Sequence, residues 1–184
     1  MRTNLRAALV AIAIGAVYFI GTGARAFSTP PANGSPAPEF TGISQWLNST
    51  PLTMHAQRGK LVLVDFWTYS CINCLNTLPY VTRWYDKYKD QGLVVVGVHT
   101  PEYAFEKSTA NVQEALNRLG VRYPVAQDNG YATWSAFHNQ YWPALYLIDV
   151  NGRIVYQHFG EGNYAETETV IQKLLAERNP SQPT

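Results

Sequence analysis

Hydrophobic residues along the chain form two kinds of pattern, short continuous runs and longer stretches with helical spacing. The runs over residues 60–67 (KLVLVDFW) and 93–99 (LVVVGVH) are almost uninterrupted, which is typical of strands that are covered on both faces. Between them, apolar side chains recur at helical spacing from Cys71 to about residue 90, and Gly92 favours a stop. Strand, helix and strand in succession predict a βαβ unit with parallel strands and a right-handed crossover.

The second half of the chain predicts another helix and a hairpin. A helix is expected over 104–119, with an inward face formed by Phe105, Val112, Leu116 and Leu119. Asn151-Gly152 is typical of a tight antiparallel turn, and apolar runs flank it over 144–150 and 153–159. The remaining expected elements are a strand over 123–128, a short helix over 131–137 and a helix over 166–178. The sum is an α/β fold, a mixed central sheet with helices on both faces.

The N-terminus has the features of an export signal. Arg2 and Arg6 precede an apolar run over 7–20, and the small-residue motif ARA follows at 24–26. A basic start, a short apolar segment and a small-residue site together predict a secretory signal peptide over 1–26. The alternative is that this segment stays uncleaved as a membrane anchor, although it is short for a span, which needs about 20 apolar residues.

The rest of the chain is expected to hold one domain. Residues 27–38 are rich in proline, serine, alanine and glycine, so they predict a flexible linker. The domain is expected over 39–179 and a short tail over 180–184, and this length suits a single domain of about 100–200 residues. Removal of the signal takes away three arginines and changes the formal net charge from +1 to −2. A near-neutral surface without basic runs argues against nucleic acid as a partner.

The two cysteines of the chain, Cys71 and Cys74, have two residues between them and three possible roles. As a structural disulfide they would close a very small ring, which stabilises by only about 2 kcal/mol. A structural zinc site needs four ligands, and the histidines are scattered without a companion at metal spacing: His55, His99, His138 and His158. A redox-active dithiol is the favoured interpretation, because C-x-x-C after a strand in a βαβ unit is the redox arrangement. No metal or other cofactor is expected.

The expected helix assigns a different role to each cysteine. Cys71 would lie at the helix N-terminus, where unpaired backbone N–H groups and the helix dipole favour a thiolate. Cys71 is therefore the expected nucleophile. Cys74, one turn further along, would be shielded and would resolve the mixed disulfide.

Asp65 interrupts an apolar run where side chains should be buried. A buried lone carboxylate is costly and tends to stay protonated. Asp65 is therefore expected to accept the proton of Cys74 when that thiol attacks. The alternative is that Asp65 lies at a strand end and only caps the backbone.

The segment VDFWTYSCINC, residues 64–74, resembles the signature of the thioredoxin superfamily, with Asp65 and Trp67 in the places of its aspartate and tryptophan. Over roughly residues 38–178 the chain resembles the exported TlpA/ResA-like group, and it looks most like the thioredoxin-like module of DipZ-type membrane thiol transporters. The resemblance implies a thioredoxin fold in which residues 102–128 form a central helix-and-strand insertion.

The same resemblance implies further site residues. It implies a cis Trp142–Pro143 bond facing the active cysteines, with Pro143 presenting substrate backbone beside the sulfurs. It also suggests substrate-binding roles for Trp67 and Trp142, which would line a groove for an extended peptide.

The chain departs from the family pattern near the cysteines. Ile72-Asn73 replaces the Gly-Pro of cytosolic thioredoxin, so the family's reduction potential does not carry over. Thr77 stands where ResA-type proteins have a glutamate, which leaves Asp65 as the main acid–base candidate. His99 and Glu102 would lie at the end of a strand, where α/β sites gather, and a loop-shaping role is the alternative for them.

The expected function is that of a periplasmic thiol–disulfide oxidoreductase that reduces protein disulfides, in cytochrome c maturation or in envelope redox homeostasis. Its expected partners are protein thiols and disulfides and, as electron donor, a membrane thiol transporter. The location would be the periplasm, or the periplasmic face of the inner membrane if the N-terminal segment is uncleaved. The alternatives are a peroxiredoxin-like peroxidase, a DsbA-like oxidant and, from another class, a copper metallochaperone.

Overall fold

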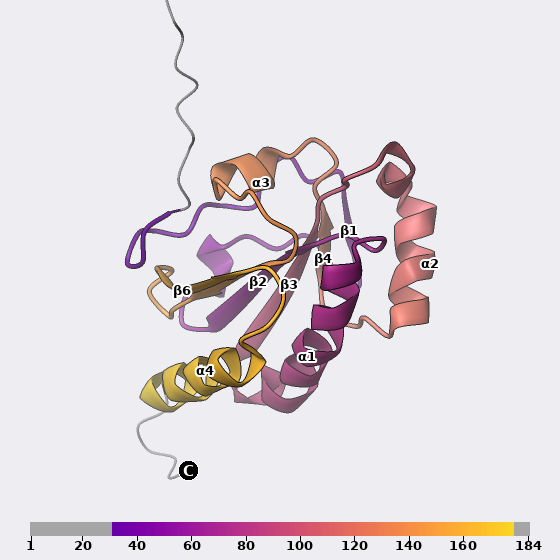
Figure 1. Cartoon of the computed structure of the whole chain (residues 1–184). Coiled ribbons are helices and arrows are strands. Elements are labelled where there is room, and N and C mark those ends of the chain that lie inside the picture. The colour runs from indigo at the N-terminus through magenta and orange to yellow at the C-terminus, as the bar shows by residue number, and fades with distance from the viewer. Residues whose placement is uncertain (1–30, 179–184) are drawn as a thin grey trace, which may run out of the picture.

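The computed structural model describes residues 31–178, which build a mixed sheet of six strands in the order β1-β4-β3-β2-β5-β6 (Figure 1). The strands are β1 (Gln45–Leu47), β2 (Leu61–Trp67), β3 (Leu93–His99), β4 (Val125–Gln127), β5 (Ala144–Ile148) and β6 (Ile154–Phe159). β3 pairs in parallel with β2 and with β4, whereas β1, β5 and β6 pair antiparallel with their neighbours. The predicted parallel βαβ unit is confirmed in β2, α1 and β3.

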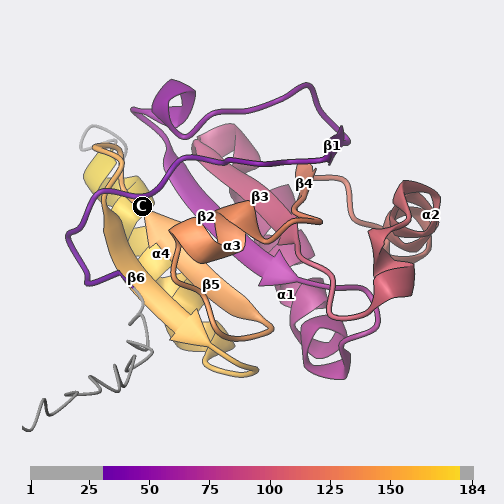
Figure 2. The ribbon, with the colours of Figure 1, turned by 90° about the horizontal axis from the view of Figure 1, so that it is seen from above.

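Helices cover both faces of this sheet, as predicted. The α-helices are α1 (Ile72–Tyr88), α2 (Thr109–Leu119), α3 (Ala132–Ala136) and α4 (Tyr164–Arg178). Three short 3-10 helices lie in the connections, η1 (His55–Gln57) between β1 and β2, η2 (Lys89–Gln91) between α1 and β3, and η3 (Ala104–Lys107) between β3 and α2. α1 and α4 lie against one face and α3 lies over the other, as the two views show (Figures 1 and 2).

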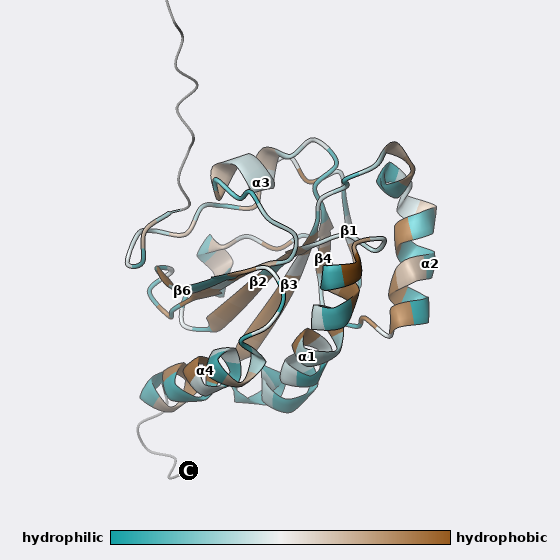
Figure 3. Cartoon of the chain, viewed as in Figure 1, coloured by the Kyte–Doolittle hydropathy of each residue, from teal (hydrophilic) through white to brown (hydrophobic). Residues whose placement is uncertain are grey.

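Alternate residues of β2 enter two separate cores, which explains its uninterrupted apolar run. Leu61, Leu63 and Trp67 pack with side chains of α1, α2 and α4 on one face. Val62, Val64 and Phe66 pack on the other face. Their partners there include Phe137, directly after α3, and Phe40 of the N-terminal segment. All of β2 is buried, and the central strands are correspondingly hydrophobic (Figure 3). A strand covered on both faces has no solvent side on which polar residues would alternate.

The hairpin between β5 and β6 turns where the sequence predicts it. Gly152 has a φ of +71°, a conformation that favours glycine. The Asp149 carboxylate accepts hydrogen bonds from the backbone N–H groups of Asn151 and Arg153, at 2.9 and 2.8 Å. A short acidic side chain thus satisfies two backbone donors inside the turn.

The helix predicted over 104–119 is divided, and this prediction is corrected. The chain forms η3 first, and α2 begins only after Ser108, whose hydroxyl accepts the backbone N–H of Asn111 at 3.4 Å. Serine favours such an N-terminal cap over continuation of a helix. Phe105, which was expected to face inward, lies on η3 and is 55% exposed.

Two other boundaries differ from the sequence prediction. β1 was not predicted, because a three-residue strand with one buried side chain leaves no readable periodicity. α4 begins at Tyr164, earlier than the expected residue 166.

Part of the predicted linker is bound to the domain. The backbone N–H of Gly34 bonds to the carbonyl of Ile154 at 2.5 Å, and that of Ala37 bonds to the carbonyl of Gly152 at 2.9 Å. Residues 34–37 therefore lie along the β5–β6 hairpin rather than forming a free spacer. Their backbone partners are distant in sequence, which a compositional argument does not reveal.

The predicted signal peptide over 1–26 and the tail over 180–184 lie outside the residues that the structure describes. Within residues 31–178, none of the helices combines the length and the apolar character that a membrane crossing requires.

Candidate functional site

The predicted site residues meet at one end of the sheet. β2 ends at Trp67, and the loop 68–70 leads directly into Cys71 at the start of α1. Pro143 precedes β5, whose first residue, Ala144, pairs with Phe66 of β2. The end of β2 and the start of β5 therefore lie at the same end of the sheet, where Cys71 lies.

Cys71 and Cys74 lie one helical turn apart and differ in exposure. Cys71 is the N-cap residue of α1 and is partly exposed, whereas Cys74 is 1% exposed. The Cys71 sulfur accepts the backbone N–H of Cys74 at 3.3 Å. The Cys71 sulfur thus takes the place of the side-chain acceptor that caps the first turn of α1. The geometry thus offers one accessible sulfur and one covered sulfur.

Cys74 is held in its thiol form. Burial raises the pKa of the Cys74 thiol well above its ordinary value, and the hydrogen bond with Cys71 and the charge of Asp65 raise it further. A thiol with a raised pKa attacks a disulfide only when a nearby base accepts its proton.

Asp65 is the buried acid next to Cys74. It lies inside β2, not at the end of the strand, and between Gly97 of β3 and Leu145 of β5. Burial raises the pKa of Asp65 from 3.8 to about 7, and its Oδ1 atom has no hydrogen-bond partner among the described residues. The alternative of a strand-end cap does not fit this position.

Two aromatic residues close the space beside Asp65. Gly97 has no side chain, and a Cβ atom there would lie 2.9 Å from Trp67 Nε1 and 3.1 Å from Tyr123 Cε2. Trp67 Nε1 and the Tyr123 hydroxyl are buried without a hydrogen-bond partner among the described residues, and the Asp65 charge acts on the Tyr123 hydroxyl. The surroundings of Asp65 therefore contain two hydrogen-bond donors that no described protein atom accepts.

The structure places the two predicted substrate-binding tryptophans differently. Trp67 is fully buried in the core, so the prediction that it binds substrate is corrected. Trp142 is half-buried, donates from Nε1 to the Thr100 carbonyl at 3.0 Å and packs on Trp134 with ring centroids 4.1 Å apart. Side-chain type alone does not distinguish a core tryptophan from one at the surface.

The Trp142–Pro143 peptide bond is cis, as the resemblance implied. Pro143 is buried, and its carbonyl accepts the backbone N–H of Gly160 at 2.8 Å. Proline has no N–H group and its carbonyl is already bonded to Gly160, so Pro143 has no free backbone donor to offer.

Glu106 is a buried site residue that the sequence analysis missed. One carboxylate oxygen accepts the hydroxyls of Thr68 and Ser70, both at 2.6 Å, and the other accepts the backbone N–H groups of Glu102 and Tyr103, at 2.6 and 2.8 Å. Burial opposes the charge, but these four hydrogen bonds outweigh burial and lower the pKa of Glu106. Glu106 therefore ties the η3 segment to the loop that carries Cys71.

Two other residues near η3, His99 and Glu102, were the candidates from sequence. His99 is buried, Tyr69 stacks on its ring with centroids 5.6 Å apart, and its Nε2 lies 3.3 Å from the Thr68 hydroxyl. Burial lowers the pKa of His99 to about 4, so the imidazole is neutral at neutral pH. The Glu102 side chain is exposed, and only its backbone N–H joins the Glu106 network. Residues 99–106, HTPEYAFE, contain both Glu102 and Glu106, and their spacing in sequence does not show which of the two carboxylates turns inward.

Replacement of Glu106 by glutamine should loosen this connection. The amide offers one oxygen where the carboxylate offers two, so two of the four donors lose their acceptor, at a cost of about 1–3 kcal/mol in the free energy of unfolding. Urea denaturation measures this loss, and hydrogen exchange should show faster exchange in 102–107. Glu102→Gln is the matched control on an exposed neighbouring carboxylate. Equal stability of Glu106→Gln and the wild type would contradict the prediction.

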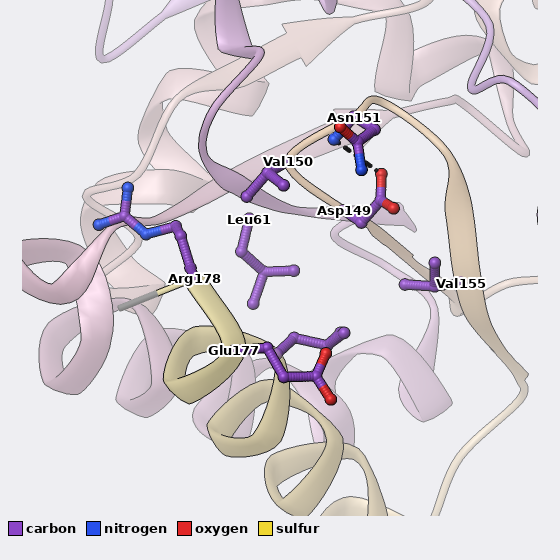
Figure 4. Close-up of a pocket in the computed structure, with 8 residues that line it drawn as sticks. Leu61, Asp149, Val150, Asn151, Val155, Glu177 and Arg178 are labelled. Carbon is purple, nitrogen blue, oxygen red and sulfur yellow. Dashed lines mark hydrogen bonds between the residues drawn. The ribbon is translucent and has the colours of Figure 1, made fainter. Parts of the chain in front are cut away.

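Two other kinds of site come into question for the described residues, a metal site and a pocket at the other end of the sheet. Within residues 31–178, no three His, Cys, Asp or Glu side chains gather where they could hold a metal ion. A pocket of about 230 Å³ lies between the start of β2, the β5–β6 hairpin and the end of α4 (Figure 4). Two of its polar side chains have roles in the fold, since Asp149 holds the turn and the terminal Arg178 nitrogens donate to the carbonyls of Gly59 and Gln91.

The chain matches a known family and is similar to several named proteins. Residues 32–175 match the model of the Redoxin family. Protein DipZ of Mycobacterium tuberculosis is 52% identical over 78% of this chain, and the chain spans only 21% of that protein's length. Thiol-disulfide oxidoreductase YkuV of Bacillus subtilis is 32% identical over 77% of this chain and 95% of its own length.

A solved structure agrees with these relatives. A thiol:disulfide interchange protein DsbE from Chlorobium tepidum, described as putative, superposes with a TM-score of 0.65 at 26% identity, over 80% of this chain and 99% of that one. The sheet and its helices are those of the thioredoxin fold, as the resemblance implied. The chain therefore belongs to the Redoxin family and has a thioredoxin fold.

Proposed function

We propose that this chain is an exported reductase of protein disulfides that works through Cys71 and Cys74. The observation that carries the proposal is the pairing of an accessible sulfur at the N-terminus of α1 with a buried sulfur one turn further along. The accessible sulfur can meet another protein's disulfide, and the buried sulfur can meet only Cys71 or what is bound to it.

The reaction has two exchange steps. The Cys71 thiolate attacks one sulfur of the substrate disulfide, so that a Cys71–substrate bond forms and the other substrate sulfur leaves as a thiolate. Cys74 then attacks the Cys71 sulfur, which forms the Cys71–Cys74 disulfide and releases the second substrate thiolate. Two electrons pass from the protein to the substrate.

Asp65 accepts the Cys74 proton in the second step. The pKa of Asp65, raised by burial to about 7, lies near the working pH, where a carboxylate is most effective in proton transfer. The burial that raises the pKa of Cys74 also keeps this thiol away from solvent.

We propose the periplasm as the location, on the strength of the export signal expected over 1–26, with attachment to the inner membrane if the signal is kept. A membrane thiol transporter is the proposed electron donor, in line with the resemblance to DipZ-type modules. Mass spectrometry of the exported protein tests the expected cleavage before Phe27.

The reduction potential of the Cys71–Cys74 pair tests the proposed direction. Equilibration of the full chain with glutathione buffers measures this potential, and a reductant is expected to lie nearer the value of thioredoxin, about −270 mV, than that of DsbA. A value close to that of DsbA, about −120 mV, would make the protein an oxidant and overturn the reductive proposal.

A further inference from the structure

The exposed large hydrophobic side chains of the described chain lie on three segments, the start of α1, the η3 segment and the loop before the cis proline. Four such residues are more than 45% exposed: Ile72 (66%), Tyr103 (52%), Phe105 (55%) and Tyr141 (48%). Ile72 lies between the two cysteines, Tyr103 and Phe105 flank the start of η3, and Tyr141 precedes Trp142 and the cis proline. Exposed apolar groups gathered in one place are typical of interaction sites.

Tyr103 and Phe105 form an ordered part of this surface. Their rings are parallel within 3°, with centroids 5.6 Å apart, and the Phe105 ring lies 6.2 Å from that of Tyr69. The Phe105 carbonyl accepts hydrogen bonds from the Tyr69 hydroxyl and from the Asn111 amide, at 3.2 and 3.1 Å. We refer to Tyr69, Tyr103 and Phe105 as the aromatic surface.

A buried carboxylate holds the aromatic surface against the cysteine loop. Glu106 binds the backbone N–H of Tyr103 with one oxygen and the hydroxyl of Ser70, the residue before Cys71, with the other. Exposed aromatic side chains on a fixed backbone lose little conformational freedom on binding, which favours affinity. The buried Glu106 carboxylate thus fixes the backbone that carries Tyr103 and Phe105, although these two side chains are exposed.

The chemistry of Cys71 determines what covers this surface. A partner whose disulfide is attacked must bring its sulfur to Cys71, so the chain that carries that disulfide also lies over the groups beside Cys71. Tyr69, Tyr103, Phe105 and the neighbouring Ile72 carry no charge, and the Glu106 charge is buried and bonded. Aromatic residues are enriched at the cores of protein interfaces, where they meet apolar groups.

We propose that the aromatic surface is a docking site for disulfide-bearing polypeptides that carry apolar side chains next to the reacting cysteine. This inference rests on the proposed function and specifies its substrate class. The partner's apolar residues pack on Tyr103 and Phe105 while its sulfur meets Cys71. Tyr69 lies between these two contacts, because it is two residues before Cys71 and its ring packs against that of Phe105.

The test compares the full-length reduced protein with its Phe105→Ser and Tyr103→Ser variants. Three probes are offered: two disulfide-linked synthetic peptides of equal length and charge, with Leu and Phe or with Ser and Gly beside the cysteines, and glutathione disulfide. We expect Phe105→Ser to slow the reaction with the apolar peptide about tenfold, and the Tyr103→Ser variant to slow it less. The reactions with the polar peptide and with glutathione disulfide should change by less than about twofold.

Conservative and alternative variants make the outcome decisive. Phe105→Leu keeps an apolar side chain and should keep the wild-type rate with the apolar peptide. The proposal is overturned if Phe105→Ser leaves that rate unchanged, if it slows all three probes equally, or if Tyr141→Ser alone slows the apolar peptide. If the wild-type protein reduces none of the probes, the proposed function itself fails. Failure of the proposed function is thus distinguished from failure of the docking site alone.

Discussion

The Asp65→Asn variant should be more stable than the wild type at pH 8, by about 4 kcal/mol in the free energy of unfolding, and about equally stable at pH 4. The reason is the cost of a buried negative charge. Burial raises the pKa of Asp65 from 3.8 to about 7, so the native protein keeps this proton over a pH range in which the unfolded chain has lost it.

The direction of the pH dependence follows from proton counting. Between about pH 4 and pH 7 the native state binds one more proton than the unfolded state at Asp65, so the free energy of unfolding falls as pH rises. The stability that Asp65 contributes is fully present below the unfolded pKa and is lost as pH rises through the folded pKa. The ionisable groups that face Asp65 are Cys74 of α1 and Tyr123 of the segment before β4, whereas its sheet neighbours, Gly97 and Leu145, do not titrate.

The same variant should lose the second exchange step. Asparagine does not accept the Cys74 proton, and removal of a general base typically slows a reaction by about 10²-fold or more. The measurement is the release of substrate from a mixed disulfide preformed on Cys71, followed over pH. The wild-type rate should rise through the pKa of Asp65, about 7, and the variant should lack this rise.

The first step serves as the internal control, because attack by Cys71 does not involve Asp65. Chemical denaturation at pH 4 and pH 8 gives the stability comparison with the same two proteins. A variant that is less stable than the wild type at pH 8, or one that releases substrate at the wild-type rate, would remove Asp65 from the proposed mechanism.

The parts of the fold that were predicted from sequence are those in which local pattern and tertiary environment agree. The apolar runs of β2 and β3 reflect burial on both faces, and Asn151-Gly152 fits the turn it forms. Cys71 is found at a helix N-terminus because a helix-forming pattern begins immediately after it. Each of these features is decided by a few consecutive residues, so the sequence alone contains the information.

The features that sequence did not reveal depend on contacts between distant segments. Phe105 has the spacing of an inward residue, but Glu106 turns inward instead, because Thr68 and Ser70 supply its hydrogen bonds from another loop. Trp67 has the type of a binding residue, but the absence of a side chain at Gly97 makes room for its ring in the core. In both cases the partner lies about 30 or more residues away in the chain, beyond the reach of any local pattern.

The Cys74→Ser variant should accumulate mixed disulfides with its substrates on Cys71, and its multiple-turnover reduction of disulfides should fall to the background rate of thiol exchange. Serine does not attack the Cys71 sulfur, so the second step stops while the first step continues. Non-reducing electrophoresis should show covalent complexes that a reductant dissolves, and mass spectrometry should find the partner's cysteine joined to Cys71.

Cys71→Ser is the matched control, because it also replaces one cysteine sulfur by oxygen, in this case at the exposed cysteine. It should form no complexes and show no turnover, since the remaining Cys74 sulfur is 1% exposed and its pKa is raised by burial. Far-ultraviolet circular dichroism of both variants checks that the fold is kept. Complexes formed through Cys74 in the Cys71→Ser protein would reverse the two assigned roles, because they would show that the buried sulfur is the one that meets a substrate first.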